Sequence, residues 1–245
     1  MDEPKIALVT GAAGTMGMAV TETFIAEGID VVMVDIVEDK LESAAERLGP
    51  RAHPYAFDIS DPELVGKAVR KITQEVGTIT ILVNNAGILS NNKVMQTTPE
   101  EWNRVLAVNL SGAFYLCKAV LPGMRTAGWG RIINTSSYAA KCGGITAGTA
   151  YAVSKGGLIT LTFSIAAETL RDGITVNGIA PVWVKTPMVT EQLTEEQRQQ
   201  VIEKIPVGRF CEPDEFAHVV SFLAAEKSGF ITGEIVDLNG GIHFD

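Results

Sequence analysis

Tyr151 and Lys155 are the residues whose types and spacing most directly suggest chemistry. They lie four positions apart, and on a helix that spacing places both side chains on one face. A phenol has an ordinary pKa of about 10, so a tyrosine base at neutral pH needs a shift of about 3 units, or roughly 4 kcal/mol. A unit positive charge about 4 Å away supplies roughly 4 kcal/mol at an effective dielectric constant of about 20. The pair therefore fits a proton-transferring tyrosine assisted by an ammonium, and the alternative is an ordinary surface pair.

Two further polar positions fit the same chemistry. Ser137 closes the run Asn134–Ser137 at the end of an apolar segment, where its hydroxyl can hold a substrate oxygen; Ser136 is a second candidate for this hydroxyl. Asn109 lies within a segment of helical periodicity, where asparagine is unfavourable. It serves either a water-linked proton path or a hydrogen bond between helices.

A glycine-rich turn lies far upstream of these residues. The segment Gly11–Gly17 follows the apolar run Ile6–Val9, and a turn without Cβ atoms lets N–H groups approach a pyrophosphate at the positive end of a helix. Asp35 ends the next apolar run, where a carboxylate can hydrogen-bond a ribose 2′-hydroxyl and repels a 2′-phosphate. Ile36 follows, where a basic residue is expected for NADP. The sequence therefore predicts NAD(H), with NADP the less favoured cofactor.

Short apolar runs separated by segments of helical periodicity must position these groups. The runs are apolar on both faces, as strands are in a parallel sheet that is covered on both sides. The alternation predicts a single doubly wound α/β domain over residues 1–245. Its least regular part, at about 181–212, is either a substrate lid or a surface insertion. The expected strands are Ile6–Val9, Val31–Val34, Tyr55–Phe57, Ile79–Val83, Ile132-Ile133, Ile174–Ile179 and Glu234–Leu238.

Composition excludes several classes of function. The 245 residues include 20 Lys and Arg against 29 Asp and Glu, so the net charge of −9 disfavours nucleic acid and anionic membranes. No apolar stretch approaches the ~18 residues of a membrane span, and no signal peptide is recognisable, so we expect a cytoplasmic protein. The three cysteines form no CxxC pair and the three histidines lie far apart, so no metal site is expected.

The order of these motifs resembles the short-chain dehydrogenase/reductase family over essentially the whole chain. The resemblance implies a Rossmann-type doubly wound seven-stranded parallel sheet with helices on both faces. It also implies a homotetramer, built partly on helices at about 100–127 and 150–171. The matching residues are Thr10–Gly17, Asp58, Asn84–Gly87, Asn109, Ser137, Tyr151, Lys155, Pro181 and Thr186.

The resemblance also implies roles for individual residues. Tyr151 would be the general acid/base, and Ser137 would polarise the substrate carbonyl. Lys155 would bind the nicotinamide ribose and, with the positive nicotinamide ring, lower the pKa of the tyrosine. Asn109 would anchor a proton relay. The implied cofactor contacts are Gly11, Gly14, Thr15, Met16, Gly17, Asp35, Ile36, Asp58, Ile59, Asn85, Ala86, Gly87, Tyr151, Lys155, Pro181, Val184 and Thr186.

Three departures from the family pattern stand out. Thr15 occupies a position where the family has glycine, and Gly14 beside it is expected to compensate. Val182 follows Pro181 where a glycine is usual. The spacing between Ser137 and Tyr151 is 14 residues, one longer than is common, which places an insertion in the substrate loop at 138–150.

The substrate is the least determined feature. The branch of beta-ketoacyl carrier-protein reductases looks closest; it normally uses NADPH and docks an acidic carrier protein on basic residues, but here the two docking positions are Gly128 and Asp172. We therefore expect an NAD(H)-dependent interconversion of a secondary alcohol and a ketone on a small polyol, sugar or hydroxy acid. The alternatives are a 3-oxoacyl-(acyl-carrier-protein or CoA) reductase and a non-catalytic NAD-binding regulator. Lys141 and Lys185 are either pocket residues that can bind an anionic substrate or solvated surface lysines. The other pocket candidates are Ser137, Tyr138, Trp183 and Met188.

Overall fold

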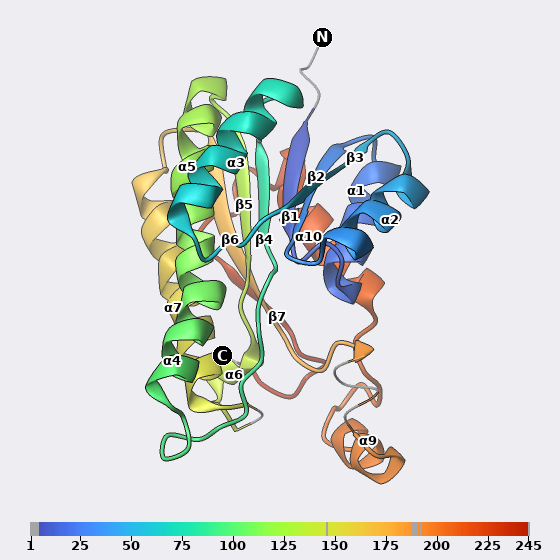
Figure 1. Cartoon of the computed structure of the whole chain (residues 1–245). Helices are drawn as coiled ribbons and strands as arrows, with labels where there is room; N and C mark the ends of the chain where they lie inside the picture. Colours follow the sequence, from blue (N-terminus) through green and yellow to red (C-terminus); the bar gives the residue numbers. More distant parts are fainter. Residues whose placement is uncertain (1–4, 146, 188–190, 192, 245) are drawn as a thin grey trace.

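Seven parallel strands form one sheet in the computed structural model, which describes residues 5–145, 147–187, 191 and 193–244. Their order is β3-β2-β1-β4-β5-β6-β7 (Figure 1). Neighbouring strands pair in parallel along the whole sheet. The predicted Rossmann-type architecture is confirmed. The strands are β1 Ile6–Thr10, β2 Asp30–Asp35, β3 Ala52–Ala56, β4 Ile81–Asn84, β5 Gly130–Thr135, β6 Ile174–Pro181 and β7 Ile235–Leu238.

The strands are apolar on both faces because helices cover both sides of the sheet. In β1, Ala7 and Val9 point into one core while Leu8 points into the other, and all three are fully buried. The predicted strands are present, with small shifts at their ends. Ile79 precedes β4 and is buried in the same core as Leu8, so its apolar character reflects packing rather than strand pairing.

Two helical layers enclose the sheet. The helices α1, α2 and α10 pack on one face, and α3, α5 and α7 pack on the other (Figure 1). The helices are α1 Thr15–Ala26, α2 Glu38–Leu48, α3 Pro62–Glu75, α4 Pro99–Leu106, the π-helix η1 Ala107–Ser111, α5 Gly112–Ala127, α6 Tyr138–Lys141, α7 Thr149–Glu168, α9 Glu195–Ile202, α10 Pro213–Ala224 and the 3-10 helix η2 Glu226–Ser228.

Helix starts follow the cap residues seen in the sequence. Asp61 accepts hydrogen bonds from the N–H groups of Glu63 and Leu64, and Thr98 accepts one from Glu101. Thr194 and Gln197 form a reciprocal capping box at α9. These local interactions fix where the chain turns from the carboxyl edge of the sheet back into a helix.

Two helical stretches are long and apolar enough to cross a membrane by length and composition alone. They are Pro99–Ala127 and Thr149–Glu168, with mean hydropathy of 1.5 and 1.2 in their most apolar windows. Both contribute side chains to the core on one face of the sheet. Core helices of soluble proteins meet the same criteria, so this finding is weak evidence for a membrane span.

The strand order reverses direction at the carboxyl edge between β1 and β4. Crossovers lead from β1 to β2 and β3 on one side, and from β4 to β5, β6 and β7 on the other. Side chains and turns from both halves meet at this switch point, where open α/β sheets bind their ligands. The segment after β6 crosses the same edge, and its Val184 forms a bridge to Cys211 before α10.

Candidate functional site

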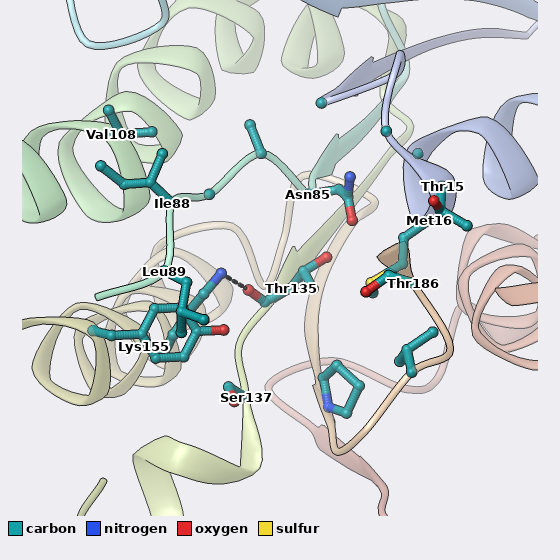
Figure 2. A pocket seen from close by; sticks show the side chains of 18 of the residues that line it. Thr15, Met16, Asn85, Ile88, Leu89, Val108, Thr135, Ser137, Lys155 and Thr186 are labelled. Carbon is teal, nitrogen blue, oxygen red and sulfur yellow. Dashed lines mark hydrogen bonds between the residues drawn. The ribbon is translucent and has the colours of Figure 1, made fainter. Parts of the chain in front are cut away.

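A cleft of about 1040 Å³ lies along the carboxyl edge of the sheet. Figure 2 shows its two sides, with Thr15, Met16 and Thr186 opposite Lys155 and Leu89. All residues predicted to contact the cofactor lie in its wall, namely Gly11, Gly14, Thr15, Met16, Gly17, Asp35, Ile36, Asp58, Ile59, Asn85, Ala86, Gly87, Tyr151, Lys155, Pro181, Val184 and Thr186.

The glycine-rich turn packs too tightly for larger residues. A Cβ atom on Gly17 would lie 2.2 Å from the carbonyl oxygen of Gly11, and Gly11 itself has a φ of +65°. Gly14 precedes α1 and donates its N–H to the Gly11 oxygen at 3.1 Å. Thr15 is the first residue of α1, so it needs no glycine conformation. The departure from the family pattern at Thr15 is therefore compatible with the turn.

Asp35 holds the turn from the neighbouring strand. Its carboxylate accepts hydrogen bonds from the N–H groups of Ala13 at 3.1 Å, Ile36 at 2.8 Å and Val37 at 3.2 Å. The carboxylate thereby joins the end of β2 to the β1–α1 turn and borders the cleft. A turn without room for Cβ atoms, the open start of α1 and an adjacent carboxylate together fit the pyrophosphate and ribose of a dinucleotide.

Asn85 supports the cleft from the end of β4. Its Nδ2 donates to the carbonyl oxygen of Thr10 at 3.0 Å, and its N–H donates to the Thr10 hydroxyl at 3.0 Å. The N–H of Ala86 donates to the same hydroxyl at 3.0 Å. Asp58, after β3, accepts hydrogen bonds from the N–H and hydroxyl of Ser60. The side chain of Asn85 thus joins β1 to β4.

Lys155 lies buried on α7 with only 3% of its surface exposed. Its Nζ donates to the carbonyl oxygen of Thr135 at 2.6 Å (Figure 2) and lies 5.8 Å from the centroid of the Tyr151 ring. Burial lowers the pKa of Lys155 from 10.5 to about 8. The helical spacing of four residues does bring the two side chains together, as predicted.

Burial is the main influence on the pKa of Tyr151. Burial raises the pKa of Tyr151 above its ordinary value, and a hydrogen bond with Ser137 opposes this by lowering it. Burial disfavours the phenolate, and the ammonium of Lys155 is directed at the Thr135 carbonyl. Tyr151 therefore keeps its proton, although burial by itself makes the phenol a weaker acid. The lowering of the Tyr151 pKa by Lys155 together with the nicotinamide ring stays a prediction.

Ser137, rather than Ser136, presents its hydroxyl to this site. Ser137 caps α6, its Oγ accepts the N–H of Ala139 at 3.1 Å, and it bonds to Tyr151. Ser136 donates its hydroxyl to the carbonyl oxygen of Lys155 at 2.8 Å and is 2% exposed. The one-residue insertion after Ser137 therefore leaves the hydroxyl within reach of Tyr151.

Asn109 lies in the π-helical turn η1, beneath the cleft wall. Its Oδ1 accepts the N–H of Ile88 at 2.8 Å, and its Nδ2 donates to the Ile88 oxygen and to Ser154 Oγ, each at 3.0 Å. A Cβ atom on Gly87 would lie 3.3 Å from both Asn109 Oδ1 and Lys155 Nζ. These bonds match the interhelical alternative for Asn109, and the proton relay stays a prediction. Short π-helical turns are frequent at functional sites.

The substrate end of the cleft departs most from the sequence-based predictions. Ser137 and Trp183 line the cleft, and Trp183 has an unusual φ of +47°. Tyr138 is not among the residues that line the cleft, and the centroids of its ring and the His243 ring lie 5.9 Å apart. Its assignment to the pocket stays a prediction. The remaining pocket candidate, Met188, lies outside the described residues.

Neither candidate lysine for an anionic substrate lines the cleft. Lys141 pairs with Asp237 at 2.7 Å, with both side chains largely buried. Lys185 pairs with Glu212 at 3.0 Å on the surface. The alternative of solvated surface lysines fits Lys185, whereas Lys141 forms a partly buried ion pair between α6 and β7.

Several residues of the wall were not found by sequence reasoning. Most are apolar, and about half lie in loops whose course depends on distant contacts. Lys40, after Asp35, could have been found as a basic residue in the next helix. In the part of the chain that the structure describes, no group of three His, Cys, Asp or Glu residues could hold a metal ion. The missed wall residues include Val34, Lys40, Ser60, Ile88, Leu89, Asn91, Arg104, Ala107, Val108, Ala139, Ala147, Val182, Pro187 and Leu193.

Comparison with known proteins shows that the chain is similar to reductases over nearly its whole length. Residues 11–243 match the family model described as enoyl-(acyl carrier protein) reductase. The chain is 38% identical to the 3-oxoacyl-[acyl-carrier-protein] reductase FabG of Thermotoga maritima over 243 residues. It is 39% identical over 242 residues to the proteins of the same name from Vibrio cholerae and Escherichia coli. In all three cases 98% of both chains is covered.

Proposed function

Because the chain belongs to the short-chain dehydrogenase/reductase family, we propose that it reduces 3-oxoacyl thioesters to 3-hydroxyacyl thioesters with NADH. The chain is an oxidoreductase that acts on a CH–OH group with NAD(P). The names of the relatives support the thioester, which replaces the small polyol, sugar or hydroxy acid as the favoured substrate.

The apolar part of the cleft wall is the observation that carries this proposal. Leu89, Ala147, Trp183 and Leu193 all line the cleft, as Ser137 does. A polyol or sugar would leave hydroxyl groups against side chains that cannot bond them, which disfavours binding. An anionic hydroxy acid would need a cation; Lys141 and Lys185 do not line the cleft, whereas Arg104 does. An acyl chain fits such a wall.

The polar groups of the site fit the proton half of the reaction. A bound nicotinamide ring supplies the hydride for reduction and accepts it in the reverse direction. Tyr151 donates its hydroxyl proton to the carbonyl oxygen, so that the ketone gains one hydride and one proton and becomes an alcohol. Ser137 shares a hydrogen bond with Tyr151 and polarises the same carbonyl. Burial keeps Tyr151 in its protonated form, which is the form that a proton donor needs.

The surface that would dock a carrier protein favours coenzyme A as the thioester carrier. Gly128 ends α5 in a left-handed conformation and carries no charge. Asp172 pairs with Arg125 at 2.8 Å, so the nearby guanidinium is already neutralised. With a net charge of −9, the protein offers little attraction to an acidic carrier protein.

The cofactor is proposed to be NADH. Asp35 places a carboxylate in the cleft wall, where it can accept hydrogen bonds from a ribose and repel a 2′-phosphate. Lys40 lies in the same wall and acts in the opposite direction. Comparison of NADH and NADPH by fluorescence titration decides between them; tighter binding of NADPH would contradict the proposal.

The assembly and setting also remain proposals. A cytoplasmic homotetramer that binds neither membranes nor nucleic acid is proposed. Phe114 on α5 and Phe163 on α7 are each nearly half exposed and offer apolar surface for subunit contact. Pro187 and Leu193 border the cleft, which supports a substrate lid within 181–212. Light scattering coupled to size-exclusion chromatography tests the tetramer.

The substrate is tested by following NADH oxidation at 340 nm across matched ketones. Acetoacetyl-CoA and longer 3-oxoacyl-CoA thioesters should give the highest kcat/KM. Carrier-protein thioesters should be poorer substrates, and NAD reduction with polyols, sugars and 2-hydroxy acids should be slow. A clear preference for any of these last three classes would contradict the proposal. NADH binding without turnover of any compound would instead identify a non-catalytic NAD-binding regulator.

A further inference from the structure

We propose that Lys93 and Lys141 are positioning residues that fasten the substrate loop at two points and thereby set the geometry of Ser137 and the acyl-binding wall. This inference rests on the proposed function, because it concerns the same cleft. The loop runs from α6 to α7 and contains the one-residue insertion between Ser137 and Tyr151. Ser137 caps the helix before this loop, and Tyr151 lies in the first turn of the helix after it.

Lys93 fastens the second half of the loop. Its Nζ donates to the carbonyl oxygens of Gly144 and Ala147, each at 2.6 Å. Gly144 has a φ of +76°, so this part of the loop follows a course that most residues disfavour. Ala147 lines the cleft. The ammonium thus supplies donors to two loop carbonyls and holds the wall that faces the substrate.

Backbone contacts place the start of α7 next to the same loop. The N–H of Gly148 donates to the Ser90 oxygen at 2.7 Å, and the N–H of Thr149 donates to the Asn92 oxygen at 3.0 Å. A Cβ atom on Gly148 would lie 2.6 Å from both of these oxygens. These bonds do not involve the Lys93 side chain. They hold the helix of Tyr151 in place, so the contribution specific to Lys93 falls on the loop before it.

Lys141 fastens the first half of the loop. Its Nζ lies 2.7 Å from a carboxylate oxygen of Asp237 in β7, and the side chains are only 14% and 18% exposed. Lys141 is the last residue of α6, the short helix that Ser137 caps. The ion pair therefore ties the helix behind the Ser137 hydroxyl to the sheet. Partial burial makes such a pair stronger than an exposed one and costly to break on one side only.

The two attachments predict separable effects on catalysis. Loss of the Lys93 hydrogen bonds loosens the second half of the loop, including Ala147. Substrate binding is then weaker, which raises KM with little change in kcat. Releasing the half held by Lys141 moves Ser137 relative to Tyr151, which lowers kcat. Because the Ser137 hydrogen bond lowers the pKa of Tyr151, its loss also shifts the pH profile of alcohol oxidation to higher pH.

The test compares Lys93→Met, Lys93→Arg and the double variant Lys141→Met with Asp237→Asn, which removes both charges together. Lys67→Met is the matched control, because Lys67 forms an exposed ion pair with Glu63 on α3. For each variant we would measure NADH affinity by fluorescence, kcat and KM with acetoacetyl-CoA, the pH profile of 3-hydroxybutyryl-CoA oxidation, and hydrogen exchange of residues 139–147.

We expect Lys93→Met to raise KM roughly 5- to 20-fold with faster exchange at residues 143–147, and Lys93→Arg to restore most of the loss. The double variant should lower kcat about tenfold and raise the apparent pKa for oxidation. NADH affinity should stay within about twofold in all variants. Unchanged kinetics and exchange in both test variants, or equal loss of NADH affinity and turnover, would overturn the inference. If the wild type turns over no thioester, the proposed function fails, and hydrogen exchange still decides whether the lysines hold the loop.

Discussion

The two halves of the cleft are built from different kinds of interaction. At the cofactor half, backbone geometry requires the residues present. Gly11 and Gly17 lie where backbone segments leave little room for a Cβ atom, and Asp35 accepts hydrogen bonds from N–H groups of nearby turns. At the substrate half, Lys93 and Lys141 act on the wall through bonds to residues 51 and 96 positions away in the sequence. The first kind of interaction is mostly between residues close in sequence, with the bond from Ala13 to Asp35 as an exception, and the second depends on how the whole chain folds.

This difference teaches where a motif is informative. A residue required by the shape of a turn can be recognised by its type and spacing alone. A residue whose partner comes from a distant element shows no such signal, and the same lysine can face a substrate, a carboxylate or solvent. The cofactor class is therefore better supported than the substrate, and the experiments below probe the two halves separately.

Replacement of Tyr151 by Phe should give the largest effect. The substitution removes the proton donor while retaining the ring, so we expect kcat for reduction to fall roughly 10²- to 10⁴-fold. NADH binding should change little, because the cofactor half of the cleft is untouched. The matched control is Tyr55→Phe, since the Tyr55 hydroxyl bonds to Glu75 at 2.7 Å outside the cleft. Wild-type turnover in Tyr151→Phe would show that another group transfers the proton.

Replacement of Gly17 by Ala should break the cofactor half. The added Cβ would lie 2.2 Å from the Gly11 oxygen, so the β1–α1 turn must shift. We expect NADH affinity to fall about 100-fold or more, as the N–H groups of the turn move away from the pyrophosphate. Gly66→Ala on α3 is the control, because its Cβ would meet only Arg70 at 3.4 Å. Equal NADH affinity in both variants, measured by fluorescence titration, would place the dinucleotide elsewhere.

Replacement of Lys155 by Met should stabilise the protein near neutral pH. Lys155 has a pKa of about 8 in the fold against an ordinary 10.5, so below pH 8 the folded state carries a buried charge. Removing this charge should relieve about 3 kcal/mol of destabilisation, part of which is offset by the lost hydrogen bond to Thr135. The free energy of unfolding should therefore rise by roughly 1–2 kcal/mol. From pH 8 to 10.5 only the unfolded wild type keeps the proton, so the wild type gains stability and the advantage of the variant disappears. Urea unfolding at several pH values tests this; a difference independent of pH would contradict it.

Much of the fold could be predicted from the sequence. The runs beginning at Ile6, Val31 and Ile174 are β-branched and apolar on both faces, and helices cover both sides of a parallel sheet. Asp61 and Thr98 marked helix starts because their side chains cap nearby N–H groups. Such signals lie within a few residues of the feature they predict.

The candidate site could be predicted only in part. Tyr151 and Lys155 share a helix face, so their proximity follows from spacing, but the raised pKa of Tyr151 depends on burial by distant segments. Tyr138 was assigned to the pocket by its place in the loop, yet its ring contacts His243 near the end of the chain. Leu193 lines the wall through the path of the segment after β6, which no local pattern encodes.

Replacement of Asp35 by Ser sharpens the cofactor assignment with a moderate effect. Serine retains an acceptor for the N–H groups of the turn but removes the charge that repels a 2′-phosphate. We expect the ratio of NADPH to NADH affinity to rise about tenfold, assisted by Lys40 in the same wall. Adding Lys40→Met should reverse part of this gain. If the ratio does not change in fluorescence titrations, Asp35 acts only as an anchor of the turn.

Replacement of Lys185 by Met should have the smallest effect. The size of this effect shows whether a charge outside the cleft influences the substrate half. Lys185 forms an exposed pair with Glu212 and does not line the cleft, so KM for acetoacetyl-CoA should change less than about twofold. Stability should fall by less than about 1 kcal/mol, because exposed ion pairs contribute little. Lys93→Met provides the contrast, since both variants remove one ammonium from the same half of the protein. A rise in KM for Lys185→Met as large as that for Lys93→Met would mean that charge near the cleft mouth, rather than attachment of the loop, governs substrate binding.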